Sequence, residues 1–547
     1  MLAKIRGKRV IFTICFFLLC LIDQRIKTAS GLDGVSETFR DLGIAVISVM
    51  ILVHYRVRDF CSADCFFHGI PYLLWTILSI AGGVLFVSRG QEISYFRNDR
   101  IMLSVSIFLL GLAVIRTLVA FLKEHRRVCL NRPAAVIWIA MFLWMNFSRS
   151  LYVWPLVYFI QFGFFYLTDY SEEEREDLFQ GMLNGVILAF FVLQGWCFVF
   201  RPYDAVRYVG AYSNCNMNAL FYLIVLAAVL CKLNFAWQRK APIAVRLFYL
   251  LGSGTLLGFL VLTISRTGWL VAVLMVVVSL IYMAKQSGKV VIFFKNACLV
   301  GLAFVIAFPL VFCAVRFIPP MFHHPVWFWG EWSEEKVHSW DAWDSDKFVS
   351  FDKLMHTSMG RVADIFFPSR KEQAEIEGPH LEVEGVNMAA PEVEITPLQQ
   401  QRYDEAFAAG FALAPGENKN PIKVRAAIYR YYIHLLNWTG HTDDELGFQM
   451  TPTHSIGHAH NLFLQYGVDF GIPVMVMLFL LVVWSFVYFG RELMRKNQGQ
   501  PVGRIFFLMV PALFGMLEYC WGNGSLAIML LFVIWRGMIC DEGKQKG

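Results

Sequence analysis

Residues 421–430 read Pro-Ile-Lys-Val-Arg-Ala-Ala-Ile-Tyr-Arg, and residues 458–471 read His-Ala-His-Asn-Leu-Phe-Leu-Gln-Tyr-Gly-Val-Asp-Phe-Gly. A polar segment with arginines and histidines thus leads directly into an apolar run, 460–489, that is long enough to span a bilayer. This junction predicts chemistry at a membrane surface, and the arginines favour an anionic ligand. The rest of the chain is expected to form the membrane body that holds it.

The composition is that of a polytopic membrane protein. The chain has 547 residues, of which 57% are apolar and 16% charged, and its mean hydropathy is +0.52. Soluble domains have about 45–50% apolar and about 25% charged residues. Because only helices and closed barrels satisfy their backbone in lipid, long apolar runs predict helices.

Apolar runs divide the chain into about 14 expected transmembrane helices. The first run, Val10 to Ile22, follows Lys4, Arg6, Lys8 and Arg9 and is either a retained helix, the favoured interpretation, or a cleaved signal peptide. The other runs are 41–55, 67–88, 101–122, 133–147, 149–168, 178–200, 217–235, 247–265, 267–284, 290–318, 460–489, 503–520 and 524–540.

The charges predict which side each loop occupies. With the N-terminus in the cytoplasm, the basic clusters fall inside, as the positive-inside rule requires. Residues 319–456 then lie outside; they hold 21 of the 42 acidic and 11 of the 48 basic residues. The split between an acidic external segment and basic internal loops does not suggest a nucleic-acid partner. None of the 12 cysteines lies in 319–456, so a disulfide framework is not expected there.

We therefore divide the chain into 1–318 (helices 1–11), 319–456 (a large extracytoplasmic loop with catalytic motifs) and 457–547 (helices 12–14). In the loop, tryptophans from 327 to 343 form an interfacial belt or small core, or else stack on sugars. Residues 371–397 read as an acidic linker, 398–414 as a helix and 415–420 as a break. Asn420-Pro421 is a helix start, and Val424, Ile428, Tyr431, Tyr432 and Leu435 give that helix one apolar face, away from Arg425.

Histidines concentrate beside the junction: ten of the 13 lie between 319 and 460. His454, His458 and His460, with His441, Asp443 and Asp444 upstream, would supply enough zinc ligands. No HExxH pattern or cysteine accompanies them, so we favour His460 as a proton acceptor without a metal; a solvated helix start is the third interpretation.

Several charged residues interrupt apolar or acidic surroundings. Arg266 breaks an apolar stretch, where it either snorkels to the interface or binds an anionic headgroup. Arg201 and Arg207 lie in an outside loop, where basic residues are disfavoured. Asp469 lies inside the 460–489 run and predicts a partner or a role.

Four stretches together resemble the O-antigen ligase and O-antigen polymerase superfamily of membrane glycan transferases. Residues 264–270 (Ile-Ser-Arg-Thr-Gly-Trp-Leu) resemble its Ser-Arg-Gly/Thr helix start, and 207–219 its Arg/Gly…Asn-x-x-Ala helix entry. Residues 424–432 resemble its Arg-x-x-x-Trp/Tyr segment. His460-Asn461, nine residues and Gly471 resemble the ligase His-Asn-x9-Gly pattern.

The resemblance implies a GT-C-like helical enzyme in the bacterial cytoplasmic membrane, with its active site on the extracytoplasmic side. Its donor would be a polyprenyl-diphosphate-linked glycan and its acceptor a glycan hydroxyl, with no cofactor or metal. Membrane lipids, a flippase and a chain-length regulator would be its other partners. The implied roles are catalysis by His460 and Arg425, diphosphate binding by Arg207, Arg266 and Arg425, and support by Asn461 and Ser265.

Three functions stay open at this point. The main hypothesis is a surface-polysaccharide polymerase, and a ligase that moves the glycan to a lipid core or a protein is the alternative within the same class. A lipid-linked glycan transporter is the alternative from another class; it predicts repeat symmetry and deep charges that the sequence does not clearly show. A non-catalytic membrane scaffold is the remaining interpretation.

Overall fold

The computed structural model describes residues 7–22, 35–60, 69–88, 94–322 (except 127, 151, 205 and 213), 341–366 (except 346), 397–413, 421–518 (except 443–444, 452–453 and 496–499) and 526–540. Within these ranges nearly all regular structure is helical, and one short hairpin is the exception. In order, the first eleven helices are α1 (Gly7–Ile22), α2 (Val35–Leu52), α3 (Ile70–Ser88), α4 (Ser94–Leu122), α5 (Arg132–Asn146), α6 (Trp154–Leu167), α7 (Glu172–Phe200), α8 (Cys215–Gln238), α9 (Ile243–Thr263), α10 (Arg266–Ser287) and α11 (Val291–Phe322).

The second half adds the segments that precede and follow the expected loop. They are α12 (Phe351–Phe366), α14 (Pro397–Ala408), α15 (Pro421–His434), β1 (Phe448–Thr451), β2 (His454–Ile456), α16 (Leu462–Phe470), α17 (Ile472–Arg495), α18 (Gln500–Met509), the π-helix η7 (Val510–Phe514) and α19 (Leu526–Ile539). The 3₁₀ turn η2 (Val57–Asp59) follows α2.

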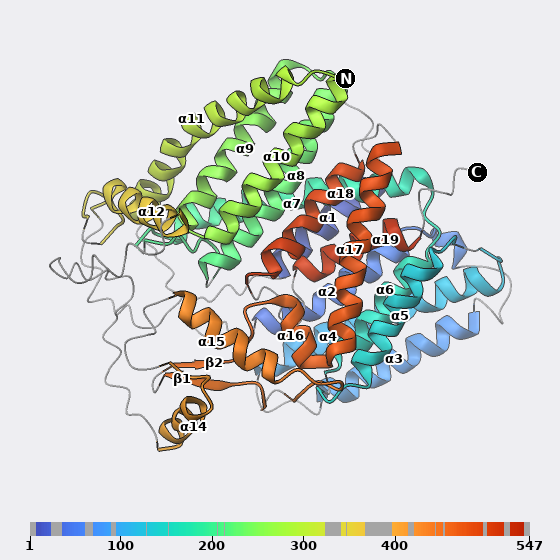
Figure 1. The fold of residues 1–547 in the computed structure, drawn as a ribbon. Helices are drawn as coiled ribbons and strands as arrows, with labels where there is room; N and C mark the ends of the chain where they lie inside the picture. Colours follow the sequence, from blue (N-terminus) through green and yellow to red (C-terminus); the bar gives the residue numbers. More distant parts are fainter. Residues whose placement is uncertain are drawn as a thin grey trace.

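The long helices run side by side, and α14, α15 and the hairpin gather at one end of them (Figure 1). Among the described residues, eight helices are long and apolar enough to cross a membrane, and four shorter apolar helices accompany them. The multi-pass helical fold is thus confirmed, whereas the count of 14 crossings stays a prediction. Helix α8 is buried along nearly its whole length, and α3 has no buried residue.

Helix α1 lies deep in the bundle. Phe12 and Phe16 are fully buried, and they pack directly on Gly181 and Gly185 of α7, where an added Cβ would overlap them. Close packing of this kind is how membrane helices approach one another without a hydrophobic driving force. The first apolar run is therefore part of the core of this structure.

Two expectations need correction. The run 460–489 is not one helix: it breaks at Gly471 into α16 and α17. The fold is not all-α, because β1 and β2 within 319–456 pair antiparallel, with Phe448 opposite Ile456. The predicted helix at 398–414 exists as α14, which ends earlier, and α15 begins at Pro421 as predicted. Most of the tryptophan cluster, the acidic linker and Asn420 lie outside the described residues.

Cysteine labelling tests the predicted sides. In a cysteine-free background, Ala409→Cys after α14 should react with an impermeant maleimide in cells whose outer barrier is opened, because 319–456 is expected outside. Ser287→Cys, at the end of α10, should react only after the inner membrane is permeabilised. Both positions are exposed, so the opposite labelling pattern would reverse the topology.

Candidate functional site

Helix α15 presents Arg425 at the edge of its packed face, where the side chain is half-buried. Ile428 and Tyr432 are buried, and the Tyr432 hydroxyl donates a hydrogen bond to the Leu446 carbonyl (2.8 Å). The Tyr431 ring stacks on Phe448 of the hairpin at a centroid distance of 4.2 Å. The predicted apolar face is confirmed, and its burial turns Arg425 away from the hairpin.

Helix α16 gives the His-Asn-x9-Gly pattern a structural meaning. The nine residues between Asn461 and Gly471 are this one helix. Asn461 is its N-cap: the side-chain oxygen accepts a hydrogen bond from the Leu464 amide (2.9 Å). The Asn461 side-chain amide also donates to the Met516 carbonyl (2.8 Å), which ties the cap to the segment after η7.

His460 precedes this cap in a left-handed backbone conformation (φ 48°). Such a conformation is uncommon for a residue other than glycine and occurs often at functional sites. It directs the imidazole towards Glu518, with Nδ1 3.6 Å from a carboxylate oxygen. The rings of His460 and His458 lie 4.2 Å apart, edge to face.

Glu518 is the residue that joins these groups. Its Oε1 accepts a hydrogen bond from Arg425 Nη2 at 2.7 Å, and its Oε2 faces His460. The Glu518 side chain is 10% exposed, compared with 37% for Arg425. The sequence interpretation missed it, although a lone acid within the run 503–520 was the available signal.

A second arginine group lies at the start of α8 and α10. Arg207 Nη2 donates to the Asn216 side-chain oxygen (2.8 Å), and Arg207 Nε donates to the Thr263 carbonyl (3.3 Å). Both acceptors are neutral, so the guanidinium charge of Arg207 is not balanced by them. Ser265 caps α10 by accepting from the Gly268 amide (3.3 Å).

Arg266, the first residue of α10, is half-buried. In the described part of the chain its guanidinium makes no hydrogen bond or ion pair. An unpaired guanidinium at the N-terminal end of a 22-residue helix favours an anionic guest, because the helix dipole adds to its charge.

The structure brings the second arginine group close to Glu518 through the helices between them. Gly268 of α10 packs closely on Ala219 of α8, which joins the two predicted motifs. Helix η7, just before Glu518, packs against both α8 and α10. Cys215, the first residue of α8, lies within range of the charges of both Arg207 and Glu518. All six sequence-predicted site residues thus lie at one end of the bundle. Arg425 and His460 share Glu518 as a partner, and Arg207 and Ser265 share Thr263.

The neighbouring ionisable groups stay neutral at pH 7. Burial, and to a smaller extent the adjacent His460, lower the pKa of His458 to about 4. Burial also raises the pKa of Tyr429, one turn after Arg425. Tyr429 therefore keeps its phenolic proton as a hydrogen-bond donor, and His458 does not add positive charge beside His460.

The lowered pKa of His458 predicts a loss of stability in acid. The unfolded chain binds this proton near its ordinary value of 6.5 and the folded chain only near 4, so acidification between these values favours unfolding. Between pH 7 and pH 5 the free energy of unfolding of the wild type should fall by on the order of 1 kcal/mol more than that of His458→Asn. This figure is discounted for the partial exposure of His458. The pH dependence of Tm, followed by tryptophan fluorescence, measures this; an equal loss in both proteins would contradict the assignment.

The remaining residues of the predicted cluster lie elsewhere or support the site. His441 Nδ1 pairs with Glu445 (3.0 Å) rather than with the other histidines. No group of three or more metal-ligating side chains occurs among the described residues, which exclude Asp443 and Asp444. Asp469 accepts a hydrogen bond from Gln465 (2.7 Å), whose own oxygen accepts from the Ala459 amide (2.7 Å). Gln465, the partner of Asp469, therefore fixes the backbone between His458 and His460.

Arg201 has a structural place in the outer loop. It is buried, and its Nε donates to the Gly210 carbonyl (2.7 Å), which holds the 201–214 connection in its folded path. Trp343, the described member of the tryptophan cluster, is exposed and packs on Phe317 at the end of α11 (4.7 Å). That position agrees with an interfacial belt.

Taken together, the described site holds Arg425 and His460 against one bridging carboxylate, with Arg207 and Arg266 at neighbouring helix starts. Such an arrangement suits an anionic ligand that also exchanges a proton. Comparison of this chain with protein-family models, with curated proteins and with solved structures finds no match.

Proposed function

We propose that this protein is a glycosyltransferase that polymerises polyprenyl-diphosphate-linked glycan units onto an acceptor glycan, outside the bacterial cytoplasmic membrane. The observation that carries the proposal is the convergence of Arg425 and His460 on Glu518, beside Arg207 and Arg266. Cationic forks suit a diphosphate leaving group, and a histidine held by a carboxylate suits a hydroxyl nucleophile.

The reaction would require one proton transfer and one displacement. The acceptor hydroxyl oxygen attacks the anomeric carbon of the donor while the bond from that carbon to the diphosphate oxygen breaks. The diphosphate leaves with the electron pair, and its charge is stabilised by Arg207, Arg266 and Arg425. The hydroxyl proton passes to His460.

Glu518 defines which nitrogen of His460 would act. The carboxylate faces Nδ1 at 3.6 Å, which is longer than a hydrogen bond and shortens to one with a small rotation of either side chain. With its proton on Nδ1, His460 offers the Nε2 lone pair to the acceptor. Glu518 therefore has the orienting role that the acid has in a catalytic triad. The donor is already activated, so this chemistry asks for no cofactor.

The test is a deletion strain whose surface glycan is separated by size. Loss of the long-chain ladder, with single units still on the acceptor, is the result expected of a polymerase. Long chains that accumulate on the lipid carrier would instead assign a ligase, the function that the His460-to-Gly471 pattern resembles. An unprocessed pool confined to the cytoplasmic leaflet would indicate transport. The same proposal includes a GT-C-like fold for this chain. It also includes a flippase and a chain-length regulator as partners.

A further inference from the structure

A polar cavity lies at the other end of the bundle from Arg425. Its volume is ≈ 530 Å³, and it is lined by the start of α1, the end of α2 with η2, the segment after α4 and the start of α7. Helix α7 has 29 residues and begins at this cavity. Its far end leads into the 201–214 loop, roughly 43 Å away along the helix. The cavity therefore shares no residue with the proposed glycan site.

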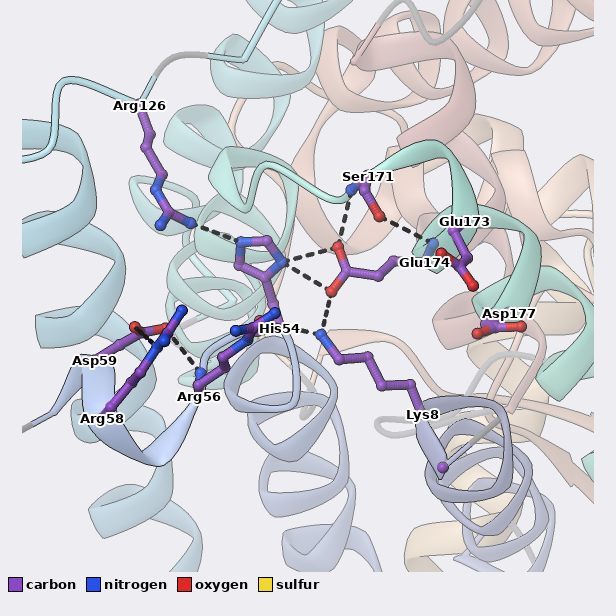
Figure 2. A pocket seen from close by; sticks show the side chains of 11 residues that line it. Lys8, His54, Arg56, Arg58, Asp59, Arg126, Ser171, Glu173, Glu174 and Asp177 are labelled. Atoms are coloured by element: carbon purple, nitrogen blue, oxygen red, sulfur yellow. Dashed lines mark hydrogen bonds and ion pairs between the residues drawn. The ribbon is translucent and has the colours of Figure 1, made fainter. Parts of the chain in front are cut away.

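Two of the four carboxylates that line this cavity pair closely with cations of the protein (Figure 2), and the other two are Asp59 and Glu173. Glu174 pairs with Lys8, and it accepts hydrogen bonds from the Ser171 amide (2.9 Å) and from His54 Nδ1 (3.1 Å). Asp177 pairs with Arg9, whose Nη2 lies 2.7 Å away. These carboxylates have little charge left to oppose an incoming anion.

His54 lies between Glu174 and Arg126. Its Nδ1 is 3.1 Å from Glu174, and its Nε2 is 3.3 Å from Arg126 Nη1. Arg126 also pairs with Glu124 through Nε (2.9 Å). These contacts hold the Arg126 guanidinium at the cavity wall (Figure 2).

Arg56 and Arg58 are the basic side chains of the lining whose guanidinium groups are least engaged by carboxylates. Both side chains are exposed and line the cavity. Among the described residues Arg56 makes no ion pair, and its backbone amide rather than its guanidinium bonds to Asp59 (2.8 Å). Arg58 Nε lies 4.0 Å from Asp59, the limit for an ion pair, with the Arg58 side chain 75% exposed. Such a pair contributes little, so both guanidinium forks are available.

We propose that this cavity binds a phosphate-bearing anion at the membrane face opposite the glycan site. Guanidinium groups match phosphate oxygens two at a time, and Arg56, Arg58 and Arg126 approach the cavity from two different segments. The ligand is either the headgroup of an anionic phospholipid or a soluble phosphorylated molecule. Basic pockets between helix ends bind anionic headgroups. The same guanidinium–phosphate contacts would bind a soluble phosphorylated molecule. The site is independent of the proposed glycan transfer.

The experiment uses the purified full-length protein in detergent, with Tm followed by tryptophan fluorescence. The probes are inorganic phosphate, and mixed micelles that contain either dioleoylphosphatidylglycerol or dioleoylphosphatidylcholine. Ligands that bind only the folded state raise Tm. Phosphate or phosphatidylglycerol should raise the wild-type Tm by several degrees, and phosphatidylcholine should not. In the double variant Arg56→Gln/Arg58→Gln, the probe concentration that gives half of the maximal Tm increase should rise at least about tenfold.

Arg491→Gln/Arg495→Gln is the matched control. It removes two exposed arginines from the end of α17, which is predicted to lie at the same membrane face, outside the cavity. The control should keep the wild-type response. A response to phosphate identifies a soluble ligand, and a response to phosphatidylglycerol alone identifies a headgroup. No response to any probe, or equal loss in both double variants, would overturn the proposal. Arg126→Gln provides a second test if the first variant is unstable without probe.

Discussion

Replacing His460 with Ala should lower turnover with lipid-linked donor about 10²–10⁴-fold, the usual effect of losing a positioned general base. The imidazole lies between Glu518 and His458, and its backbone conformation fixes where it points. Because His458 keeps a pKa of about 4, it cannot take over the base role near neutral pH. Single-turnover kinetics with purified enzyme would measure the loss.

Two controls separate the base from other roles of His460. Treatment with a chelator should leave wild-type activity nearly intact, and activity that returns only with zinc would assign His460 to a metal instead. Glu518→Gln should cost less than His460→Ala, because it removes the orienting charge and leaves the imidazole. The double variant should then be no worse than His460→Ala alone, since residues that act as a unit are not additive. If the two losses of turnover were additive, Glu518 would not act through His460.

Arg425→Lys should lower turnover at least about tenfold while the protein still reaches the membrane in normal amounts. A guanidinium can hold two phosphate oxygens at once, whereas lysine is a single point charge. Charge-assisted hydrogen bonds contribute about 1.5–3 kcal/mol each, and each 1.36 kcal/mol is a factor of ten in rate. If the contact strengthens as the diphosphate departs, the loss appears in turnover rather than in donor affinity alone.

Arg430→Ala is the matched control on the same helix. Arg430 is exposed, and its Nη1 donates to the Gly410 carbonyl (2.8 Å), away from Glu518. Its loss should change turnover much less than Arg425→Lys. Wild-type turnover in Arg425→Lys would remove Arg425 from the diphosphate site and leave its pair with Glu518 as a structural contact.

The helical body could be predicted from sequence because it follows from local composition. Most expected apolar runs coincide with one helix, since lipid forces an apolar segment to satisfy its own backbone; the runs 460–489 and 503–520 each divide in two. The face of α15 was also predictable, because residues three and four apart share one side of a helix. The hairpin of β1 and β2 was not, because strands of four and three residues give almost no periodic signal.

Pairings across the chain were the part that sequence could not supply. Arg425 and Glu518 are separated by 93 residues, so nothing local indicates that they meet. Asp469 was recognised as an acid that needs a partner, and that partner, Gln465, was only one turn away. Glu518 lies in an equally apolar run, so the rule that an acid in such a run has a partner or a role also applies to it.

The join between α15 and α17 has a mechanical consequence. The Ile472 amide donates to the Asn437 carbonyl (2.8 Å), and an added Cβ on Gly471 would overlap the Trp438 carbonyl. An added Cβ on Gly440, in the segment after α15, would likewise overlap the Asp469 carbonyl. With backbones this close, α15 and α16 cannot slide past each other, so Arg425 and His460 travel as one piece. Any movement that separates Glu518 from Arg425 and His460 must therefore also break the hydrogen bond from Asn461 to the Met516 carbonyl.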